Sequence, residues 1–441
     1  MKVLKFGGTS VGSPESLTRV KEIVCSQEGT AFVVLSAMSG VTNELLQVLE
    51  AIKNGDQSKL EQSIAVIQQK HEHLITTIFT DEVLVKDSMD YVIKTLQSLH
   101  DLSKTSDLDN LYSEVITVGE LLSTYVFSNF LKQDQTPNSC LRATDFMHIA
   151  NSDNPAIGPV KSALDKVLAA QENVGIYITQ GFVCLDAEGK VSNLKRGGSD
   201  YSATIIGAAL DADEVQIWTD IDGFHNNDPR CVDNTQPIAQ LTYDEAAELA
   251  YFGAKILHPK TVSPVREKGI PVFLKNTFDP ESVGTKISDA STKKGLKAIA
   301  AKDGITAINI KSNQMLMAYG FLRKVFEVFE KFETPIDMIT TSEIAVSLTI
   351  DDTKNLAQII SAIEKYATVT IAKEQTIISV VGDSLISEGN SIHIFSILDT
   401  VPVRMISYGG STNNISILVD TDHKIQALRL LNTALFEVIE A

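Results

Sequence analysis

Residues 5–14 read KFGGTSVGSP and connect a short apolar run to the start of a predicted helix. Ser13 suits the N-cap of that helix and Pro14 suits its first turn. A glycine loop between a strand and a helix can present backbone N–H groups and a helix N-terminus to an anion. The stretch therefore predicts an α/β unit with an anion-binding loop.

The alternation of short apolar runs and longer helical stretches continues to about residue 290. Strands are predicted at 3–6, 31–36, 139–142, 174–179, 215–219 and 271–274. Several of these runs are apolar on both faces, as the central strands of a buried parallel sheet are. We expect an α/β domain over residues 1–290, with helices covering a largely parallel central sheet and a helical insertion at about 54–104.

The C-terminal part repeats itself with a period of about 70 residues. The sequence PIDMIT at 335–340 aligns with PVRMIS at 402–407, and each copy reads as helix, turn, strand, strand. This repeat predicts two small α+β modules. The polar stretch 279–297 is predicted to be the linker that precedes them.

Composition disfavours several classes of protein. The 441 residues are 44 % hydrophobic and 21 % charged, which is typical of globular chains. A net charge of -18 would repel nucleic acid and anionic membranes. No apolar run reaches the roughly 20 residues that span a bilayer, and no signal-peptide pattern is present, so we expect a cytoplasmic protein. The four cysteines are widely spaced, and no metal-binding pattern is recognised.

A second glycine loop, LKRGGSDY at 194–201, has cations before its glycines and a carboxylate after them. Phosphoryl transfer depends on positioning and on positive charge from lysine, backbone amides and a metal ion. Lys5 and the two glycine loops could supply this environment if they face one another. The alternative for Arg196 and Asp200 is a surface ion pair. The first loop is not a Walker motif, and no Gly-x-Gly-x-x-Gly follows a predicted strand.

Two further stretches add polar residues near the ends of predicted elements. IWTD at 217–220 closes a predicted strand, and the polar loop NNDPR follows at 226–230. Ligands bind outside the carboxyl ends of the strands in open α/β sheets, so this loop is a candidate for ligand binding. FGAKILHP at 252–259 adds a lysine near the end of a helix. His258 has no paired His or Cys, so it is predicted to pack or cap rather than bind metal.

Together these motifs resemble the aspartokinases of the amino acid kinase family over nearly the whole chain. The resemblance rests on KFGGTS (5–10), VLSA (34–37) with Gly40, TN (42–43), GE (119–120), TQGF (179–182), RGGSD (196–200), WTD (218–220), DPR (228–230) and FGAKILHP (252–259). It implies the three-layer αβα amino acid kinase fold over residues 1–290, followed by two ferredoxin-like ACT modules, the family's amino-acid-sensing units. The modules would span 305–376 and 377–441, the second completed by a strand near 297–304. The lack of a dinucleotide fingerprint predicts an enzyme not fused to homoserine dehydrogenase.

The resemblance implies phosphoryl transfer from ATP to the β-carboxylate of L-aspartate, giving 4-phospho-L-aspartate on the route to lysine, threonine and methionine. Lys5 would neutralise the moving group, and Asp200 would orient Lys5, since the acceptor carboxylate is already ionised. Arg196 would hold the α-carboxylate and Glu120 the amino group. The full set of implied substrate residues is Ser36, Thr42, Glu120, Arg196, Gly197, Gly198 and Ser199.

The resemblance also implies a nucleotide site and a regulatory site. The implied ATP residues are Lys5, Phe6, Gly7, Gly8, Thr219, Asp220, His225, Arg230 and Lys255, with His225 where many relatives have tyrosine. Mg²⁺ is expected to bind mainly through the ATP phosphates. The implied effector residues, similar to those of the lysine-sensitive class, are Met315, Phe321, Leu322, Ile336, Asp337, Thr341, Ser342 and Glu343.

Asp337 and Glu343 would receive the amino groups of lysine, and the alternative is that both are solvated turn residues. ACT modules commonly pair across chains, so a homodimer or a tetramer is expected. Two other functions stay open at this point: a kinase of the same fold for another amino-acid carboxylate, and a catalytically silent amino-acid sensor. The paired modules argue against the first, and the presence of Lys5, Glu120, Arg196 and Asp200 argues against the second.

Overall fold

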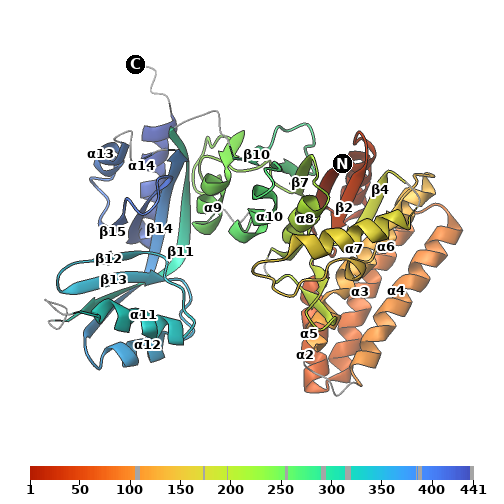
Figure 1. Cartoon of the computed structure of the whole chain (residues 1–441), viewed down its shortest axis with the longest axis horizontal. Helices are drawn as coiled ribbons and strands as arrows, with labels where there is room; N and C mark the ends of the chain where they lie inside the picture. The colour runs from red at the N-terminus through yellow and green to blue at the C-terminus, as the bar shows by residue number, and fades with distance from the viewer. Residues whose placement is uncertain are drawn as a thin grey trace. The chain divides into compact units, whose positions relative to one another are not determined.

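The structure is a computed structural model that describes residues 1–104, 110–171, 174–195, 197–253, 257–289, 295–312, 319–383, 385 and 390–437. The chain forms two compact units (Figure 1), each described by itself below. Unit 1 contains Met1–Phe224, Ala239–Tyr243 and Leu257–Ala290, and unit 2 contains His225–Ile238, Asp244–Ile256 and Ser291–Ala441. Two stretches from within the predicted first domain therefore group with the C-terminal part.

Unit 1 is built on an eight-stranded sheet in the order β3-β4-β2-β1-β7-β9-β10-β8. Its strands are β1 (Lys2–Phe6), β2 (Ala31–Leu35), β3 (Ser139–Cys140), β4 (Ile176–Gln180), β7 (Glu214–Thr219), β8 (Gln240–Thr242), β9 (Val272–Asn276) and β10 (Thr285–Ser288). Every neighbouring pair is parallel except β9 with β10. This confirms the largely parallel sheet, and the fully buried β2 is typical of a central strand.

Helices connect the strands of unit 1. They are α1 (Pro14–Cys25), α2 (Val41–Asn54), α3 (Gln57–Ile78), α4 (Glu82–Leu102), α5 (Leu111–Ile116), α6 (Val118–Gln133), α7 (Ile157–Ala169), α8 (Gly198–Ala209) and the short α10 (Ser263–Arg266). α1 begins as predicted, because the Ser13 side chain caps it by accepting from the Ser16 N–H. α3 and α4 confirm the helical region at 54–104 and bury their apolar faces in one core with α2 and α6.

A small hairpin and two 3-10 turns complete unit 1. The hairpin pairs β5 (Val183–Leu185) with β6 (Val191–Asn193), and the turns are Ala143–Asp145 and Pro259–Val262. His258 caps the second turn, where its side chain accepts from the Lys260 N–H, which confirms the predicted capping role.

Unit 2 is built on a six-stranded antiparallel sheet in the order β12-β13-β11-β14-β16-β15. The strands are β11 (Gly295–Lys311), β12 (Ile339–Thr341), β13 (Ala345–Ile350), β14 (Thr368–Asp383), β15 (Val403–Ser407) and β16 (Asn414–Asp420). The helices are α11 (Phe321–Lys331), α12 (Leu356–Ile363), α13 (Asn390–Ile397) and α14 (Lys424–Phe436), with a 3-10 turn at Thr421–His423, and most of α9 (Tyr243–Tyr251) also belongs here.

The predicted repeat is confirmed by the order of elements. Helix, strand, strand, helix occurs first as α11, β12, β13, α12 and again as α13, β15, β16, α14. Each copy has its own core, one between α11, α12 and their strands and the other between α13, α14 and theirs. Figure 1 shows the first copy with α11 and α12 together on one side of their strands.

Two long strands are common to both copies. The first half of β11, 295–302, pairs with 377–383 of β14, and its second half, 305–311, pairs with 368–375. The register shifts between the halves, near Lys302 and Ile305. Residues 295–302 therefore lie beside the second module, and the two modules share one continuous sheet.

The predicted linker at 279–297 was wrong in its middle and at its end. Thr285–Ser288 forms β10 of the first sheet, and Gly295 begins β11. Of the four residues of β10, only Thr285 and Ile287 are buried, so the strand has little apolar signal. Thr285 is held by the fold, since its hydroxyl accepts from the Phe224 N–H at 2.8 Å.

Among the described residues, no helix combines the length and the apolar character that crossing a membrane requires.

We predict that Gly119→Ala destabilises the chain by about 1–3 kcal/mol, as overpacking does, whereas Gly158→Ala does not. Each glycine is the second residue of its helix, α6 or α7. A Cβ at 119 would lie 2.6 Å from the Cβ of Ala37, but a Cβ at 158 would meet no atom within 4 Å. Denaturant unfolding followed by circular dichroism measures both variants, and equal losses of stability would contradict this packing argument.

Candidate active site

The two glycine loops meet through one ion pair. Lys5 is in β1, and Asp200 is in the first turn of α8. Their side chains are 12 % and 14 % exposed, and Lys5 Nζ lies 2.7 Å from Asp200 Oδ1. The two loops that the sequence analysis singled out are therefore neighbours in space, and a lysine ammonium is fixed between them.

The first loop packs so closely against neighbouring backbone that no side chain fits at Gly8. The Gly7 N–H donates to the Trp218 carbonyl at 3.2 Å. A Cβ at Gly8 would lie 2.9 Å from the Ala37 carbonyl oxygen, and one at Gly7 would lie 3.6 Å from Lys5 Nζ. The space beside the lysine ammonium is thus bordered by the backbone of Gly7 rather than by a side chain, which leaves room for a ligand to reach the ammonium.

The second loop forms the N-terminus of α8. Gly197 has a left-handed φ of 72° and is the N-cap of α8, and no side chain among the described residues caps that helix. Its first-turn N–H groups thus have no capping side chain, and the positive end of the helix dipole favours an anion there. A Cβ at Gly198 would lie 2.3 Å from the Phe182 ring, so that ring packs directly against the glycine backbone of the loop. Arg196 lies outside the described residues.

Glu120 is a buried carboxylate with an unused acceptor. It is in the first turn of α6 and 5 % exposed, and its Oε2 has no hydrogen-bond partner among the described residues. Burial raises the pKa of Glu120 to about 8, against the lowering effect of hydrogen bonds from the backbone of Ala37 and of Glu120 itself. A ligand ammonium would donate a hydrogen bond to Glu120 Oε2, and its positive charge would lower the pKa of the Glu120 carboxyl group and favour its ionised form.

Two of the predicted substrate residues, Ser36 and Ser199, lie at the carboxyl ends of the neighbouring strands β2 and β4. Ser36 follows β2, its N–H donates to the Phe6 carbonyl at 3.2 Å, and its own carbonyl accepts from Ser123 of α6 at 2.8 Å. Ser199 lies against Gly181 at the end of β4, because a Cβ at 181 would lie 2.6 Å from the Ser199 Cβ. Thr42 is exposed in the first turn of α2. This edge of the sheet is where open α/β folds bind ligands.

The predicted nucleotide residues divide between the two units. Thr219 and Asp220 follow β7 in unit 1, where the Thr219 hydroxyl donates to Asp220 Oδ1 at 3.0 Å. Phe6 is fully buried and stacks on Trp218 with ring centroids 5.8 Å apart, so only its backbone is available to a ligand. Lys255 lies outside the described residues.

His225 and Arg230 belong to unit 2. His225 Nδ1 lies 3.0 Å from the Thr235 hydroxyl. The Arg230 side chain is 84 % exposed, and its guanidinium holds Asp228 through two bonds of 2.9 and 2.8 Å. Hydrogen bonding to Arg230 lowers the pKa of Asp228. Arg230 is thus paired within its own loop while its charge stays accessible.

The predicted effector residues belong to unit 2, and they differ widely in exposure. Leu322, Thr341, Ser342 and Glu343 are exposed, Ile336 is half-buried, and Phe321 is buried in the core of the first module. Met315 lies outside the described residues. The Asp337 side chain is only 2 % exposed, so the alternative of a solvated turn residue is wrong for Asp337. For Glu343, which is exposed after β12, it stays open.

Sequence reasoning missed the partners that bury Asp337. The Lys302 ammonium and the Tyr251 hydroxyl donate to Asp337 Oδ1 at 2.7 and 2.8 Å. Neither partner is near Asp337 in the sequence, and neither belongs to a recognisable motif, so no local pattern could have found them.

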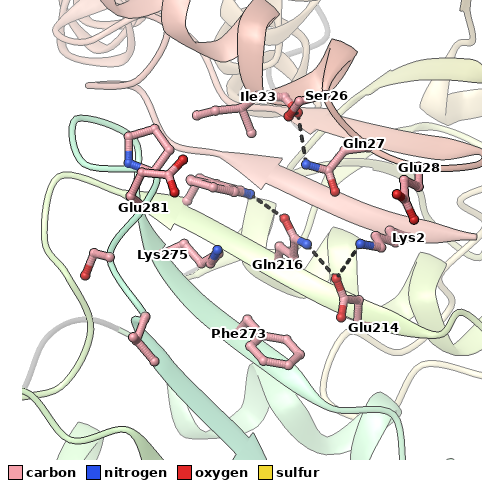
Figure 2. A pocket seen from close by; sticks show the side chains of 14 residues that line it. Lys2, Ile23, Ser26, Gln27, Glu28, Glu214, Gln216, Phe273, Lys275 and Glu281 are labelled. Atoms are coloured by element: carbon pink, nitrogen blue, oxygen red, sulfur yellow. Dashed lines mark hydrogen bonds and ion pairs between the residues drawn. The ribbon is translucent and has the colours of Figure 1, made fainter.

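A cleft of about 600 Å³ lies on the other face of the first sheet (Figure 2). Lys2 of β1 lines it, and Lys2 and Lys5 point to opposite faces because side chains alternate along a strand. Its polar groups bond to one another: Gln216 links the Trp218 indole at 2.9 Å to Glu214 at 2.6 Å, and Lys2 lies 3.4 Å from Glu214. This cleft is thus separate from the candidate site.

Comparison with known proteins identifies the same family that the sequence motifs resemble. The amino acid kinase family model matches residues 1–276, and an ACT domain model matches 378–435. Lysine-sensitive aspartokinase 3 of Escherichia coli is 31 % identical, with 99 % of each chain covered. Aspartokinase 1, chloroplastic, of Arabidopsis thaliana is 34 % identical over 99 % of this chain and 80 % of its own.

Two crystal structures of E. coli aspartokinase III also match the fold. The complex with aspartate and ADP, in the R-state, has a TM-score of 0.85 at 29 % identity. The complex with lysine and aspartate, in the T-state, has a TM-score of 0.83 at 29 % identity. Each match covers 99 % of this chain and all of the other.

We predict that Glu120→Gln stabilises the ligand-free chain, and by more at pH 8.5 than at pH 5. The folded pKa of Glu120, about 8, lies above the roughly 4.3 of an unfolded glutamate. The folded state therefore holds an extra proton between these values, and the free energy of unfolding falls as pH rises through that window. Glutamine removes this loss, worth roughly 1–3 kcal/mol for one buried polar group.

Urea unfolding at the two pH values measures the effect, with the exposed Glu188→Gln as the control. A gain for Glu120→Gln that is the same at both pH values would show that Glu120 does not titrate in this window.

Proposed function

This chain belongs to the amino acid kinase family and to its aspartokinases, and from that membership we propose how its own residues carry out and regulate phosphoryl transfer. The proposed reaction moves the γ-phosphoryl group of ATP to the β-carboxylate of L-aspartate. The observation that carries this proposal is the Lys5–Asp200 ion pair between two glycine loops. The buried Glu120, whose Oε2 has no partner among the described residues, lies close to the same sheet edge, because it accepts a hydrogen bond from the backbone of Ala37.

Aspartate brings one ammonium and two carboxylates, and the candidate site offers a complement to each. Glu120 Oε2 is a buried acceptor without a partner among the described residues, which suits the ammonium. Arg196 is proposed to hold the α-carboxylate in bidentate fashion. Ser36, Thr42, Gly197, Gly198 and Ser199 are proposed to complete the substrate site, with the start of α8 facing negative charge.

Lys5 is the proposed electrostatic catalyst. The acceptor carboxylate is ionised near pH 7, so it attacks the γ-phosphorus without a general base. A new bond forms from the carboxylate oxygen to phosphorus, the bond to the bridging oxygen breaks, and ADP leaves with that electron pair. The Lys5 ammonium, held by Asp200 at 2.7 Å, would neutralise charge on the transferring group.

ATP is proposed to lie against Lys5, Phe6, Gly7, Gly8, Thr219, Asp220, His225, Arg230 and Lys255. An ATP-dependent kinase works with a divalent metal, and we propose Mg²⁺. No group of three or more His, Cys, Asp or Glu side chains in the described part of the chain is placed to hold a metal. We propose that Mg²⁺ binds mainly through the phosphate oxygens of ATP, because this ion usually keeps several waters and needs few protein ligands. When bound, the ion supplies positive charge at the phosphates.

The ACT modules are proposed to regulate the reaction, with lysine as effector. The E. coli structure in the T-state contains lysine and aspartate, and the effector residues proposed here are Met315, Phe321, Leu322, Ile336, Asp337, Thr341, Ser342 and Glu343. Inhibition is then a coupling between two sites. Assembly as a homodimer through the ACT modules, or as a tetramer, is part of this proposal. The expected cytoplasmic location stays a prediction and fits an enzyme that consumes ATP.

We predict that Lys5→Ala lowers kcat by about a thousandfold or more, because it removes positive charge from the transferring group. Lys2→Ala, in the same strand but on the other face, is expected to keep nearly the wild-type rate. An assay coupled to ADP release, with aspartate and Mg-ATP, measures both, and circular dichroism checks that both fold. An unchanged rate for Lys5→Ala would refute the role of Lys5, and a clear preference of the wild type for glutamate would refute the proposed acceptor.

We predict that Thr341→Phe weakens inhibition by lysine about tenfold or more, because a bulky ring blocks the proposed effector residues. Turnover without lysine is expected to change by less than about twofold, since Thr341 is exposed and distant in sequence from the catalytic loops. Thr353→Phe, at another exposed position in the first module, is the control. Inhibition of Thr341→Phe with an unchanged midpoint would place the effector elsewhere.

A further inference from the structure

The loop His225–Ile238 lies between β7 and β8, yet it groups with unit 2 although both strands belong to unit 1. The loop closes on itself at its base. The Asn226 N–H donates to the Gln236 carbonyl at 2.9 Å, and the Gln236 N–H donates to Asn226 Oδ1 at 2.8 Å. Because the loop contains His225 and Arg230, two of the proposed ATP residues, its attachment to unit 2 bears on nucleotide binding.

The second C-terminal module holds this loop through backbone and apolar contacts. The Ile299 N–H of β11 donates to the Asn226 carbonyl at 2.8 Å. Val232 is 6 % exposed and lies in the same core as the apolar residues of α13 and α14, and Cys231 packs against that core. The loop is thus built into the second module.

A buried pair of amides adds a polar link to α14. Asn227 and Asn432 are 3 % and 1 % exposed. Asn227 Nδ2 donates to Asn432 Oδ1 at 3.2 Å and to the Leu428 carbonyl at 3.4 Å, and both acceptors belong to α14. Buried amides are costly without partners, so this pair fixes the position of the loop against the helix.

The hydrogen bonds continue from this pair to Arg230. Asn227 Oδ1 accepts from the Asp228 N–H at 2.9 Å, and the Asp228 carboxylate holds the Arg230 guanidinium through bonds of 2.9 and 2.8 Å. Hydrogen bonding to Arg230, and less strongly the charge of Lys424 at the start of α14, lower the pKa of Asp228. A continuous row of hydrogen bonds thus runs from α14 to the exposed guanidinium.

We propose that Asn432 of the second module is a positioning residue for Mg-ATP. It acts through Asn227 and Asp228, and it fixes the direction from which the Arg230 guanidinium meets the nucleotide phosphates. An arginine that is already oriented loses less side-chain freedom when it binds a phosphate. The inference rests on the proposed kinase function and deepens it. It assigns part of the nucleotide affinity to a helix outside residues 1–276, which match the amino acid kinase family.

The test is steady-state kinetics on the full chain, with Mg-ATP and L-aspartate varied separately. We expect Asn432→Ala to raise the KM for Mg-ATP about five- to tenfold and to leave kcat and the KM for aspartate within about twofold. Asn227→Ser shortens the side chain, so the loop keeps a nearby oxygen but loses its bond to α14, and the same rise is expected. Calorimetric titration with ADP repeats the comparison without turnover.

Ser379→Ala is the matched control. It removes a buried hydrogen bond of the same module, the 2.6 Å contact between the Ser379 and Ser416 hydroxyls, and neither residue belongs to the loop. We expect the KM for Mg-ATP to stay within about twofold of the wild-type value.

A double-mutant cycle with Arg230→Ala shows whether Asn432 acts through Arg230. In the Arg230→Ala background, Asn432→Ala is expected to change the KM for Mg-ATP by less than about twofold, because the group that it positions is gone. Independent effects would multiply instead.

Two results would overturn the inference alone, in a wild type that phosphorylates aspartate and binds ADP. One is an unchanged KM for Mg-ATP in Asn432→Ala, and the other is a rise that persists in full in the Arg230→Ala background. A wild type that neither phosphorylates aspartate nor binds ADP would refute the kinase proposal, and this inference with it. Thermal unfolding checks that each variant folds, and Asn227→Ser decides the matter if Asn432→Ala does not fold.

Discussion

The ion pair of Lys5 with Asp200 is the constraint on which the candidate active site depends. Both side chains are mostly buried, and burying two charges is costly unless each holds the other in good geometry. The pair joins the end of β1 to the start of α8, so the two glycine loops are fixed on either side of one ammonium. A cation held in a poorly hydrated place acts more strongly on nearby negative charge than the same cation in water. The buried carboxyl group of Glu120 lies close to the same sheet edge, and its Oε2, which has no partner among the described residues, would take up negative charge when a ligand ammonium reaches it.

Much of this arrangement could be predicted from the sequence, because its signals are local. Ser13 and Pro14 mark the start of α1, and the apolar runs of β1, β2 and β7 indicate buried parallel strands whose carboxyl ends share one edge. The meeting of two loops at that edge follows from the fold class. The sequence could not predict contacts between residues that no motif connects, such as the packing of the Phe182 ring against Gly198. Nor could composition reveal β10, which lies in a polar stretch and was mistaken for linker.

Contacts in unit 2 were also beyond prediction from local sequence motifs. Its repeated modules follow from the repeat in the sequence, yet the burial of Asp337 depends on Lys302 and Tyr251, which no motif connects to it. Lys302 lies where the register of β11 shifts between its two halves, one beside each module. The charge on Asp337 is therefore matched at the junction of the two modules, within a sheet whose long strands run through both. Asp337, which the sequence motif predicts to bind an effector, thus already accepts hydrogen bonds from Lys302 and Tyr251 through one of its two oxygens.

The central claim is that Lys5, fixed by Asp200 between the two glycine loops, meets the transferring phosphoryl group. A crystal structure of the full chain with ADP, aluminium fluoride and L-aspartate tests it most directly, because the fluoride complex resembles the phosphoryl group during transfer. The account predicts the fluoride complex within hydrogen-bond distance of Lys5 Nζ and of the backbone N–H group of Gly8. A complex bound away from Lys5, with the ion pair to Asp200 intact and no ligand between the loops, would contradict it.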